Sequence, residues 1–214
     1  MNRHIPSPPH SAPEIPPPEP QRLHHPGGKL VEEGAYTLKQ AELLAIVIGS
    51  GVPGRPALAI ANAILDEYVG LYNIHRRATL AELVRIPGLG SRKAARILAA
   101  VELGRRLRRL MTTPETTPAD RADLFSSLQP SPKAQPELQE RSDASFLAEI
   151  IGSGIHGRPP KVIAEDLLAR FGSFLGLFGQ DMGDFLDIKG LNSVKIIRIA
   201  ATLEIAKRIA HALS

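Results

Sequence analysis

The chain has 214 residues, with 19 prolines, 18 glycines, no cysteine, no tryptophan and a net charge of +4. Without cysteine, it cannot form disulfides, thiolate metal sites or a cysteine nucleophile. No apolar run approaches the roughly 20 residues of a membrane-spanning helix, and prolines interrupt the N-terminus where a signal core would lie. We therefore expect a soluble, cytoplasmic protein, and its mild basic charge suggests a polyanionic partner.

Two proline-rich segments divide the chain. Residues 1–29 contain nine prolines and residues 112–139 contain five, and both segments have few apolar side chains. Such segments bury too little surface to offset the entropy of ordering, so we expect a disordered tail and an interdomain linker. Residues 119–128 of the linker are expected to form a short helical turn. The histidines of the tail are better explained as solvated side chains than as metal ligands, because no ordered scaffold would fix them.

The two remaining segments, residues 30–111 and 140–214, repeat one another. Residues 44–51 align with 147–154, and residues 86–91 align with 188–193 after a gap of one residue. A run of matches in the same order predicts a tandem duplication of one small domain. The first copy has 12 Lys and Arg against 7 Asp and Glu, whereas the second has 9 against 9. The basic charge therefore belongs to the first copy.

Each copy has the pattern of short amphipathic helices. In residues 57–67, apolar side chains at Leu58, Ala61, Ile64 and Leu65 share one helical face. Further along, Thr79 and Glu82 predict a capping box, and Ser91 is a candidate N-cap for a helix that continues to about Leu110. Alternating strand patterns are scarce. We therefore predict an all-α fold with four or five short helices in each copy.

A glycine-rich loop in each copy fits the dinucleotide-binding pattern G-x-G-x-x-G, at residues 49–54 and 152–157. A Rossmann site also needs a strand before the loop and a second strand after the following helix, and neither is indicated here. We instead expect Gly49 and Gly51 to end one helix in left-handed conformation, with Pro56 starting the next. Arg55 and Arg158 in these loops could contact a phosphate or simply be solvated.

Residues 83–98 form the most informative stretch, which we call the first hairpin. Apolar residues precede a Gly-Leu-Gly turn, and small and apolar residues at helical spacing follow it. Glycines in such a turn expose successive amides, and the next helix adds the partial positive charge of its N-terminus, so phosphate groups are favoured there. Leu89 is expected to point inward. The predicted phosphate-binding residues are Gly88, Leu89, Gly90, Ser91, Arg92, Lys93 and Arg96. Backbone contacts of this kind carry little sequence preference.

This stretch resembles the helix-hairpin-helix motif of DNA-repair and recombination proteins. The wider segment resembles the N-terminal helical domain of RadC-like proteins, in residues 38–51, the first hairpin and residues 100–107. The resemblance covers residues 30–109, and residues 142–209 as a diverged copy. It implies DNA binding in repair or recombination. RadC-like proteins usually continue into a JAB-type metalloprotease-like domain whose zinc site needs a His-x-His pair, and this sequence has none. We therefore expect no enzymatic activity, no metal and no cofactor.

The second hairpin, residues 185–200, departs from the first. Asn192 replaces the second turn glycine and is expected to tolerate the left-handed conformation, while Val194 replaces Arg92 and Asp187 replaces Arg85. This hairpin is expected to bind phosphate weakly, to pack on the first copy, or to hold a partner protein. Its candidate phosphate contacts are Gly190, Leu191, Asn192, Ser193, Lys195 and Arg198. Four phenylalanines of this copy, Phe171, Phe174, Phe178 and Phe185, are expected in the core, with an exposed patch for a partner as the alternative.

Two functions are consistent with these features. The first is non-catalytic binding of duplex or branched DNA through the backbone phosphates, mainly by the first hairpin. The second is a protein-interaction adaptor, in which the hairpins are only helix junctions and the second copy or the proline-rich tail recruits partners. The neutral second copy motivates this alternative. Reversing charge in the first hairpin distinguishes them, because only the first function depends on those cations.

Overall fold

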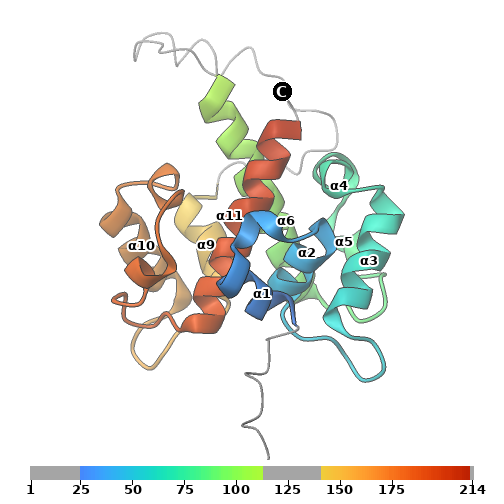
Figure 1. Cartoon of the computed structure of the whole chain (residues 1–214), viewed down its shortest axis with the longest axis horizontal. Coiled ribbons are helices and arrows are strands. Elements are labelled where there is room, and N and C mark those ends of the chain that lie inside the picture. The colour runs from blue at the N-terminus through green and yellow to red at the C-terminus, as the bar shows by residue number, and fades with distance from the viewer. Residues whose placement is uncertain (1–24, 113–140, 213–214) are drawn as a thin grey trace, which may run out of the picture.

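A computed structural model describes residues 25–112 and 141–212, and these residues fold into helices joined by short turns (Figure 1). Within those ranges the only β-structure consists of isolated bridges, which confirms the predicted all-α class. Most of the predicted tail and linker, including residues 119–128, lies outside the described residues. The elements are α1 (Pro26–Glu33), η1 (Ala35–Thr37), α2 (Gln40–Ile48), α3 (Ala57–Tyr68), α4 (Leu71–Arg77), α5 (Leu80–Leu83), α6 (Ser91–Thr112), α9 (Asp143–Ile151), α10 (Pro160–Phe171), η2 (Leu175–Leu177), η3 (Met182–Phe185) and α11 (Ser193–Ala212).

Helix α1 begins before the boundary predicted from the sequence. It starts at Pro26, and the Nδ1 atom of His25 accepts a hydrogen bond from the amide of Gly28 at 3.1 Å. Pro26 suits this position because the first helical residue needs no amide donor. Leu30 is buried, and α1 packs against α2 and α11. The predicted boundary of the tail at residue 29 was therefore wrong, because residues 26–29 belong to a capped helix.

Two helix starts show how local chemistry sets the boundaries. The Thr79 hydroxyl accepts from the amide of Glu82 at 3.2 Å, and Glu82 accepts from the amide of Thr79 at 2.8 Å, which confirms the predicted capping box. At α6 the prediction was wrong by one residue. The carbonyl of Gly90 accepts from the amide of Ala94 at 3.0 Å, so Gly90 is the N-cap and Ser91 is the first helical residue.

Helix α3 spans residues close to those predicted and buries most of the predicted face, with Leu58 as the exception. Leu58 was expected on the core side, yet it is exposed, whereas Ile60, Ala61 and Ile64 are fully buried. The loop before the helix packs closely on its first residues. Gly51 packs so closely on the start of α3 that a Cβ there would lie 2.3 Å from the carbonyl oxygen of Arg55. The glycine at position 51 therefore permits the close approach of the loop to the start of α3.

The glycine-rich loops end one helix and lead into the next. Gly49 ends α2 with a φ of +85° and Gly152 ends α9 with a φ of +81°, as predicted for a helix C-terminus. The expectation of a left-handed Gly51 was wrong, because only Gly49 and Gly54 have positive φ in that loop. Isolated bridges join Val52 to Arg55 and Ile155 to Arg158, so the two loops have the same form.

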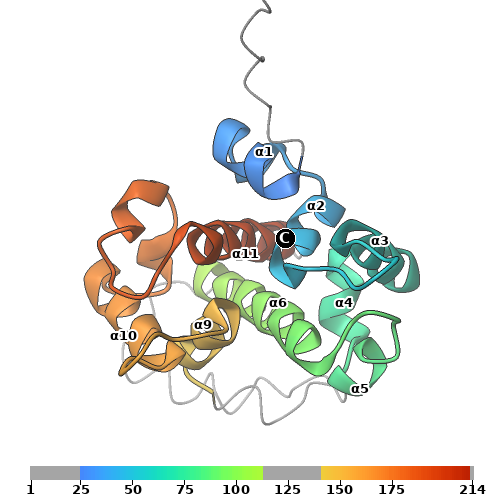
Figure 2. The same ribbon diagram turned by 90° about the horizontal axis from the view of Figure 1, so that it is seen from below.

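The two halves of the molecule, residues 25–112 and 141–212, share one hydrophobic core rather than forming separate domains. The long helices α6 and α11 cross at its centre and pack side by side, with α2 to α5 on one side and α9 and α10 on the other (Figure 2). Gly104 of α6 permits the close crossing, because a Cβ there would lie 2.9 Å from Cβ of Ile209 on α11. Helix α2 packs on α11 and α9 packs on α6, so each half completes the core of the other.

The phenylalanines of the second half belong to this core, as predicted. Phe174 and Phe185 are buried, and Phe171 and Phe178 are half-buried and pack against the core. The Phe171 and Phe185 rings stack with centroids 5.0 Å apart, while Phe174 and Phe178 meet edge to face at 5.3 Å. Such ring pairs add to the stability of the second half. No helix among the described residues is long and apolar enough to span a membrane.

Candidate nucleic-acid interface

The turn of the first hairpin requires one glycine rather than two. Gly88 has a φ of +88°, and a Cβ there would lie 2.8 Å from Cδ1 of Ile60. Gly90 lies outside the left-handed region and has open space around it. Leu89 is buried as predicted, and its amide donates to the carbonyl of Ile86 at 3.0 Å. The turn is therefore anchored to α3 through Gly88 and to the core through Leu89.

Two cations hold this turn from its inner side. The ammonium of Lys93 donates to the carbonyls of Gly88 at 3.2 Å and Gly51 at 3.3 Å, and Nη1 of Arg55 donates to the carbonyl of Pro87 at 2.9 Å. Lys93 was predicted to face a phosphate, but in the structure its ammonium joins the hairpin to the glycine-rich loop. Its contact with DNA stays a prediction, and its visible role is to shape the turn.

The outer side of the first hairpin carries unneutralised positive charge. Gly90, Ser91 and Arg92 are exposed, and the amides of the first turn of a helix have no acceptor within that helix. Arg85 and Arg92 are exposed as well, and neither forms an ion pair with a carboxylate among the described residues. Arg85 was not among the predicted contacts. In the sequence, Arg85 is a charged residue between the apolar Val84 and Ile86, a pattern that indicates an exposed side chain.

The second hairpin repeats this geometry with different chemistry. Gly190 has a φ of +104°, and a Cβ there would lie 2.5 Å from Cδ1 of Ile163. Lys195 is buried and donates to the carbonyl of Gly190 at 2.6 Å, and burial followed by Arg198 lowers the pKa of Lys195. Asn192 is not left-handed, which corrects the sequence prediction. It caps α11 instead, with Oδ1 accepting from the amide of Lys195 at 3.0 Å.

The outward surface of the second hairpin is less cationic. Val194 is 62% exposed where the first hairpin has Arg92. Asp187 forms an ion pair with Arg170 at 3.1 Å, and Arg158 is paired with Asp166. Ser193 is exposed, Leu191 is half-buried, and Lys189 is the exposed cation of the turn. The difference in charge expected between the two copies is therefore present at their surfaces.

Arg96 and Arg198 do not lie beside the turns of their own hairpins. Both side chains extend to the C-terminal ends of α2 and α9. Nη1 of Arg96 donates to the carbonyl of Ile48 at 3.5 Å, and Nη1 of Arg198 donates to the carbonyls of Ile150 and Ile151 at 3.2 and 3.3 Å. Burial and the neighbouring Arg96 lower the pKa of Arg198 to about 10, so it is cationic at neutral pH.

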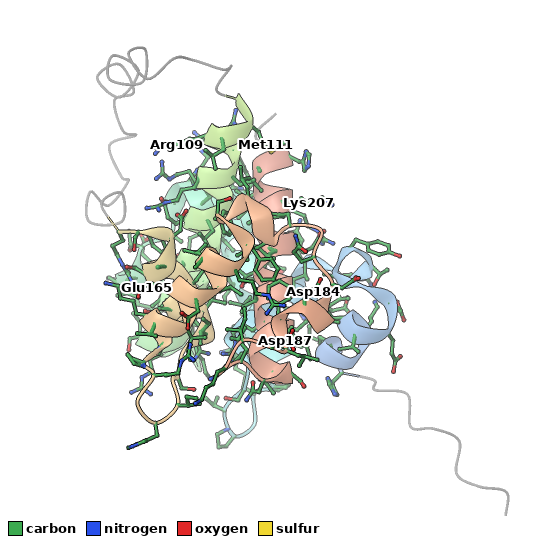
Figure 3. The ribbon with its side chains drawn as sticks, turned by 90° about the vertical axis from the view of Figure 1, so that its left-hand side faces the viewer. Arg109, Met111, Glu165, Asp184, Asp187 and Lys207 are labelled. Atoms are coloured by element: carbon green, nitrogen blue, oxygen red, sulfur yellow. The ribbon has the colours of Figure 1, made fainter. Side chains whose placement is uncertain are left out.

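These features gather toward one end of the molecule. The N-terminal ends of α6 and α11 lie in the lower half of Figure 1, and the two glycine-rich loops hang below them. Figure 3 shows Asp187 toward this end, whereas Arg109 and Met111 lie at the opposite end of α6. The N-terminal ends of α6 and α11 therefore lie toward the same end of the molecule. Among the described residues, no cluster of three or more His, Asp and Glu side chains could hold a metal ion.

Comparison with known proteins agrees with the geometry of the first half. Residues 20–95 match the UPF0758 N-terminal family. The matched segment contains α1 to α5, the glycine-rich loop and the turn of the first hairpin. This confirms, for the first half, the resemblance to RadC-like proteins found in the sequence. The match does not include the second half of the chain, so it does not test the predicted tandem duplication.

Several UPF0758 proteins are similar to the chain. One from Syntrophomonas wolfei is 43% identical over 96 residues, which are 42% of this chain and 41% of that protein. One from Geotalea uraniireducens is 47% identical over 83 residues, covering 38% and 36%. One from Chloroflexus aurantiacus is 41% identical over 109 residues, covering 49% and 47%. The chain thus spans less than half the length of these relatives. No solved structure matches the chain.

Proposed function

We propose that this protein binds DNA without catalysis and largely without sequence preference, through phosphate contacts by the first hairpin. The observation that carries this proposal is the exposed surface of the hairpin: Ser91 and Arg92 at the start of α6 and Arg85 before the turn are exposed, and no described carboxylate forms an ion pair with either arginine. Free amides and unpaired guanidinium groups are the donors that phosphate oxygens accept best. The resemblance to helix-hairpin-helix proteins supports a role in DNA repair or recombination.

Each residue of the first hairpin has a distinct role in this proposal. The amides of Gly90, Ser91 and Arg92 bind a phosphate, and the side chains of Arg85 and Arg92 add charge. Gly88 and Leu89 give the turn its shape, and Lys93 holds that shape from inside through the carbonyl of Gly88. Because phosphates are the same at every base pair, such contacts give affinity without reading sequence.

We also infer that the two halves are tandem copies of one domain. The shared loop form, the positive φ at both Gly88 and Gly190, and the paired order of matches along the sequence support this inference. In this arrangement the second hairpin faces the same ligand as the first. It contributes less to binding, because Val194 and the paired Asp187 replace exposed cations.

The test reverses the charge of Arg85 and Arg92, which are exposed and form no ion pair with a described carboxylate. Arg85→Glu with Arg92→Glu is expected to weaken binding to a labelled duplex by at least about 100-fold at low salt, since each reversal replaces attraction by repulsion. Fluorescence anisotropy measures the affinity. Arg77→Glu is the matched control, because Arg77 is exposed on α4, away from the hairpin. Equal affinities for the double variant and wild type would contradict the proposal.

The alternative function is a protein-interaction adaptor. Its specific support is the apolar surface of the second hairpin, where Leu186 is 60% and Val194 is 62% exposed. Exposed apolar groups close together favour contact with another protein. If the charge-reversed double variant binds DNA as wild type does, while Leu186→Ser with Val194→Ser abolishes recovery of a defined protein partner, this alternative replaces DNA binding.

A further inference from the structure

Arg96 and Arg198 come from different halves of the chain and meet where those halves join. A Cβ placed on Gly49 would lie 3.4 Å from Nη2 of Arg198 and 3.9 Å from Nη1 of Arg96. Two guanidinium groups therefore lie within 4 Å of one point. On the other side, a Cβ on Gly152 would lie 2.8 Å from Nη2 of Arg96. Gly49 and Gly152 are exposed, so the point between them opens to solvent.

The positive charge at this junction exceeds its neutralisation. Neither arginine forms an ion pair within 4 Å with a carboxylate of residues 25–112 or 141–212. Glu149 and Arg92 are the charged groups that act electrostatically on Arg96, and the charged group that acts on Arg198 is Arg96 itself. The ends of α2 and α9 supply only about half a negative charge each. Two half-buried cations held together in this way favour an anion between them.

Both arginines also have donors to spare. Each uses Nη1 on helix-end carbonyls, at Ile48 for Arg96 and at Ile150 and Ile151 for Arg198. The Nη2 groups have no hydrogen-bond acceptor among the described residues, and they are the atoms that approach Gly152 and Gly49. A side chain at either glycine would occupy this space. The planar fork of a guanidinium matches the oxygens of phosphate, so the chemistry of the site selects that group.

We propose that Arg96 and Arg198 form a phosphate-binding site at the junction of the two halves, between the loops that begin at Gly49 and Gly152. The site is separate from the outer surface of the first hairpin. It holds either a phosphodiester group of a nucleic acid backbone or a free phosphate anion. It does not depend on the proposed DNA binding, because a free anion fills it equally well.

The first experiment titrates the full chain with inorganic phosphate by isothermal calorimetry, replacing chloride at constant ionic strength. We expect saturable binding by wild type. Arg198→Gln is expected to weaken it by about tenfold or more, the loss of one charge-assisted hydrogen-bonding group. Arg77→Gln, at an exposed position on α4, is the matched control and leaves phosphate affinity unchanged. Absence of saturable binding by wild type would overturn the proposal.

A second variant avoids removing a side chain that bridges the halves. Glu149→Gln removes the acidic neighbour of Arg96 and is expected to tighten phosphate binding by about threefold or more. An unchanged affinity in this variant, together with wild-type affinity in Arg198→Gln, would contradict the site. Circular dichroism of each variant confirms that the helices are retained.

A competition experiment separates the two sources of phosphate. If a short DNA duplex displaces bound inorganic phosphate, the site takes a backbone phosphodiester. If phosphate binds and the duplex does not displace it, the site takes a free phosphate anion. Both results support the site. Equal DNA affinities for wild type and the Arg85→Glu and Arg92→Glu variant would contradict DNA binding by the first hairpin. That result would leave the phosphate site at Arg96 and Arg198 unaffected, so the two proposals fail independently.

Discussion

Nη1 of Arg106 on α6 lies 2.6 Å from Oδ1 of Asp143 at the start of α9. The same guanidinium contacts Glu102 at 3.1 Å, donates to the carbonyl of Arg141 and lies over the ring of Phe146, 4.6 Å from its centroid. One side chain thus joins the long helix of the first half to the first helix of the second. Asp143 also favours the start of α9 through the helix dipole.

Arg106→Ala is expected to destabilise the protein by about 2–3 kcal/mol, because it leaves Glu102, a buried acid, with one cation fewer. Urea unfolding followed by circular dichroism measures the change. Arg170→Ala is the control, since its pair with Asp187 is exposed and such pairs contribute under about 1 kcal/mol. Equal losses in the two variants would contradict a role for Arg106 in joining the halves.

The two glycines of the first turn are expected to differ in their response to substitution. Gly88→Ala places a methyl group 2.8 Å from Ile60 at positive φ, and about 1–3 kcal/mol of stability is lost. Gly90→Asn introduces at the start of α6 the side-chain cap that Asn192 provides at the start of α11. The free energy of unfolding is expected to rise by about 0.3 kcal/mol. Chemical denaturation of both variants checks this. A tolerated Gly88→Ala would show that the turn is not anchored to α3.

His75 makes stability depend on pH. Burial, and then the charge of Arg105, lower its pKa below the ordinary value of 6.5. The unfolded chain therefore binds a proton more readily than the folded one, and stability falls as the pH drops from 6.5 toward the folded-state pKa. Between about pH 7.5 and pH 5.5, the urea midpoint of wild type should fall further than that of His75→Asn. Parallel falls in both proteins would exclude this contribution.

The second hairpin can be given the charge of the first. Asp187→Arg with Val194→Arg introduces two exposed cations at positions equivalent to Arg85 and Arg92. If both hairpins face the same DNA, affinity should rise by about three- to tenfold and the salt dependence should steepen by about one to two units of slope. Asp187→Gln with Val194→Gln serves as the control. Unchanged affinity in the arginine variant would indicate that the second hairpin faces away from DNA.

Local patterns in the sequence predicted much of this structure. The Thr79 and Glu82 capping box, the buried Leu89 and the positive φ of Gly49 at the end of α2 each depend on residues within a few positions of one another. Such features follow from backbone geometry and short-range hydrogen bonds, which the sequence displays directly. The all-α class followed from the same evidence, because helical periodicity occurs in every compact segment.

Features that depend on contacts distant along the chain could not be predicted. Lys93 donates to Gly51, which lies 42 positions away, so its inward direction depends on how the glycine-rich loop folds back. Arg96 approaches Gly152 of the other half, which requires the crossing of α6 and α11. The sequence indicated two repeated segments but carried no local signal that they share one core.

The most direct test of the central claim is the affinity of the full chain for duplex DNA across a salt series, measured by fluorescence anisotropy. Several phosphate contacts predict binding that weakens steeply with salt, with a log–log slope of about −3 to −6. The Arg85→Glu and Arg92→Glu variant should show both weaker binding and a shallower slope. No binding by wild type at low salt, or binding that is independent of salt, would contradict the account.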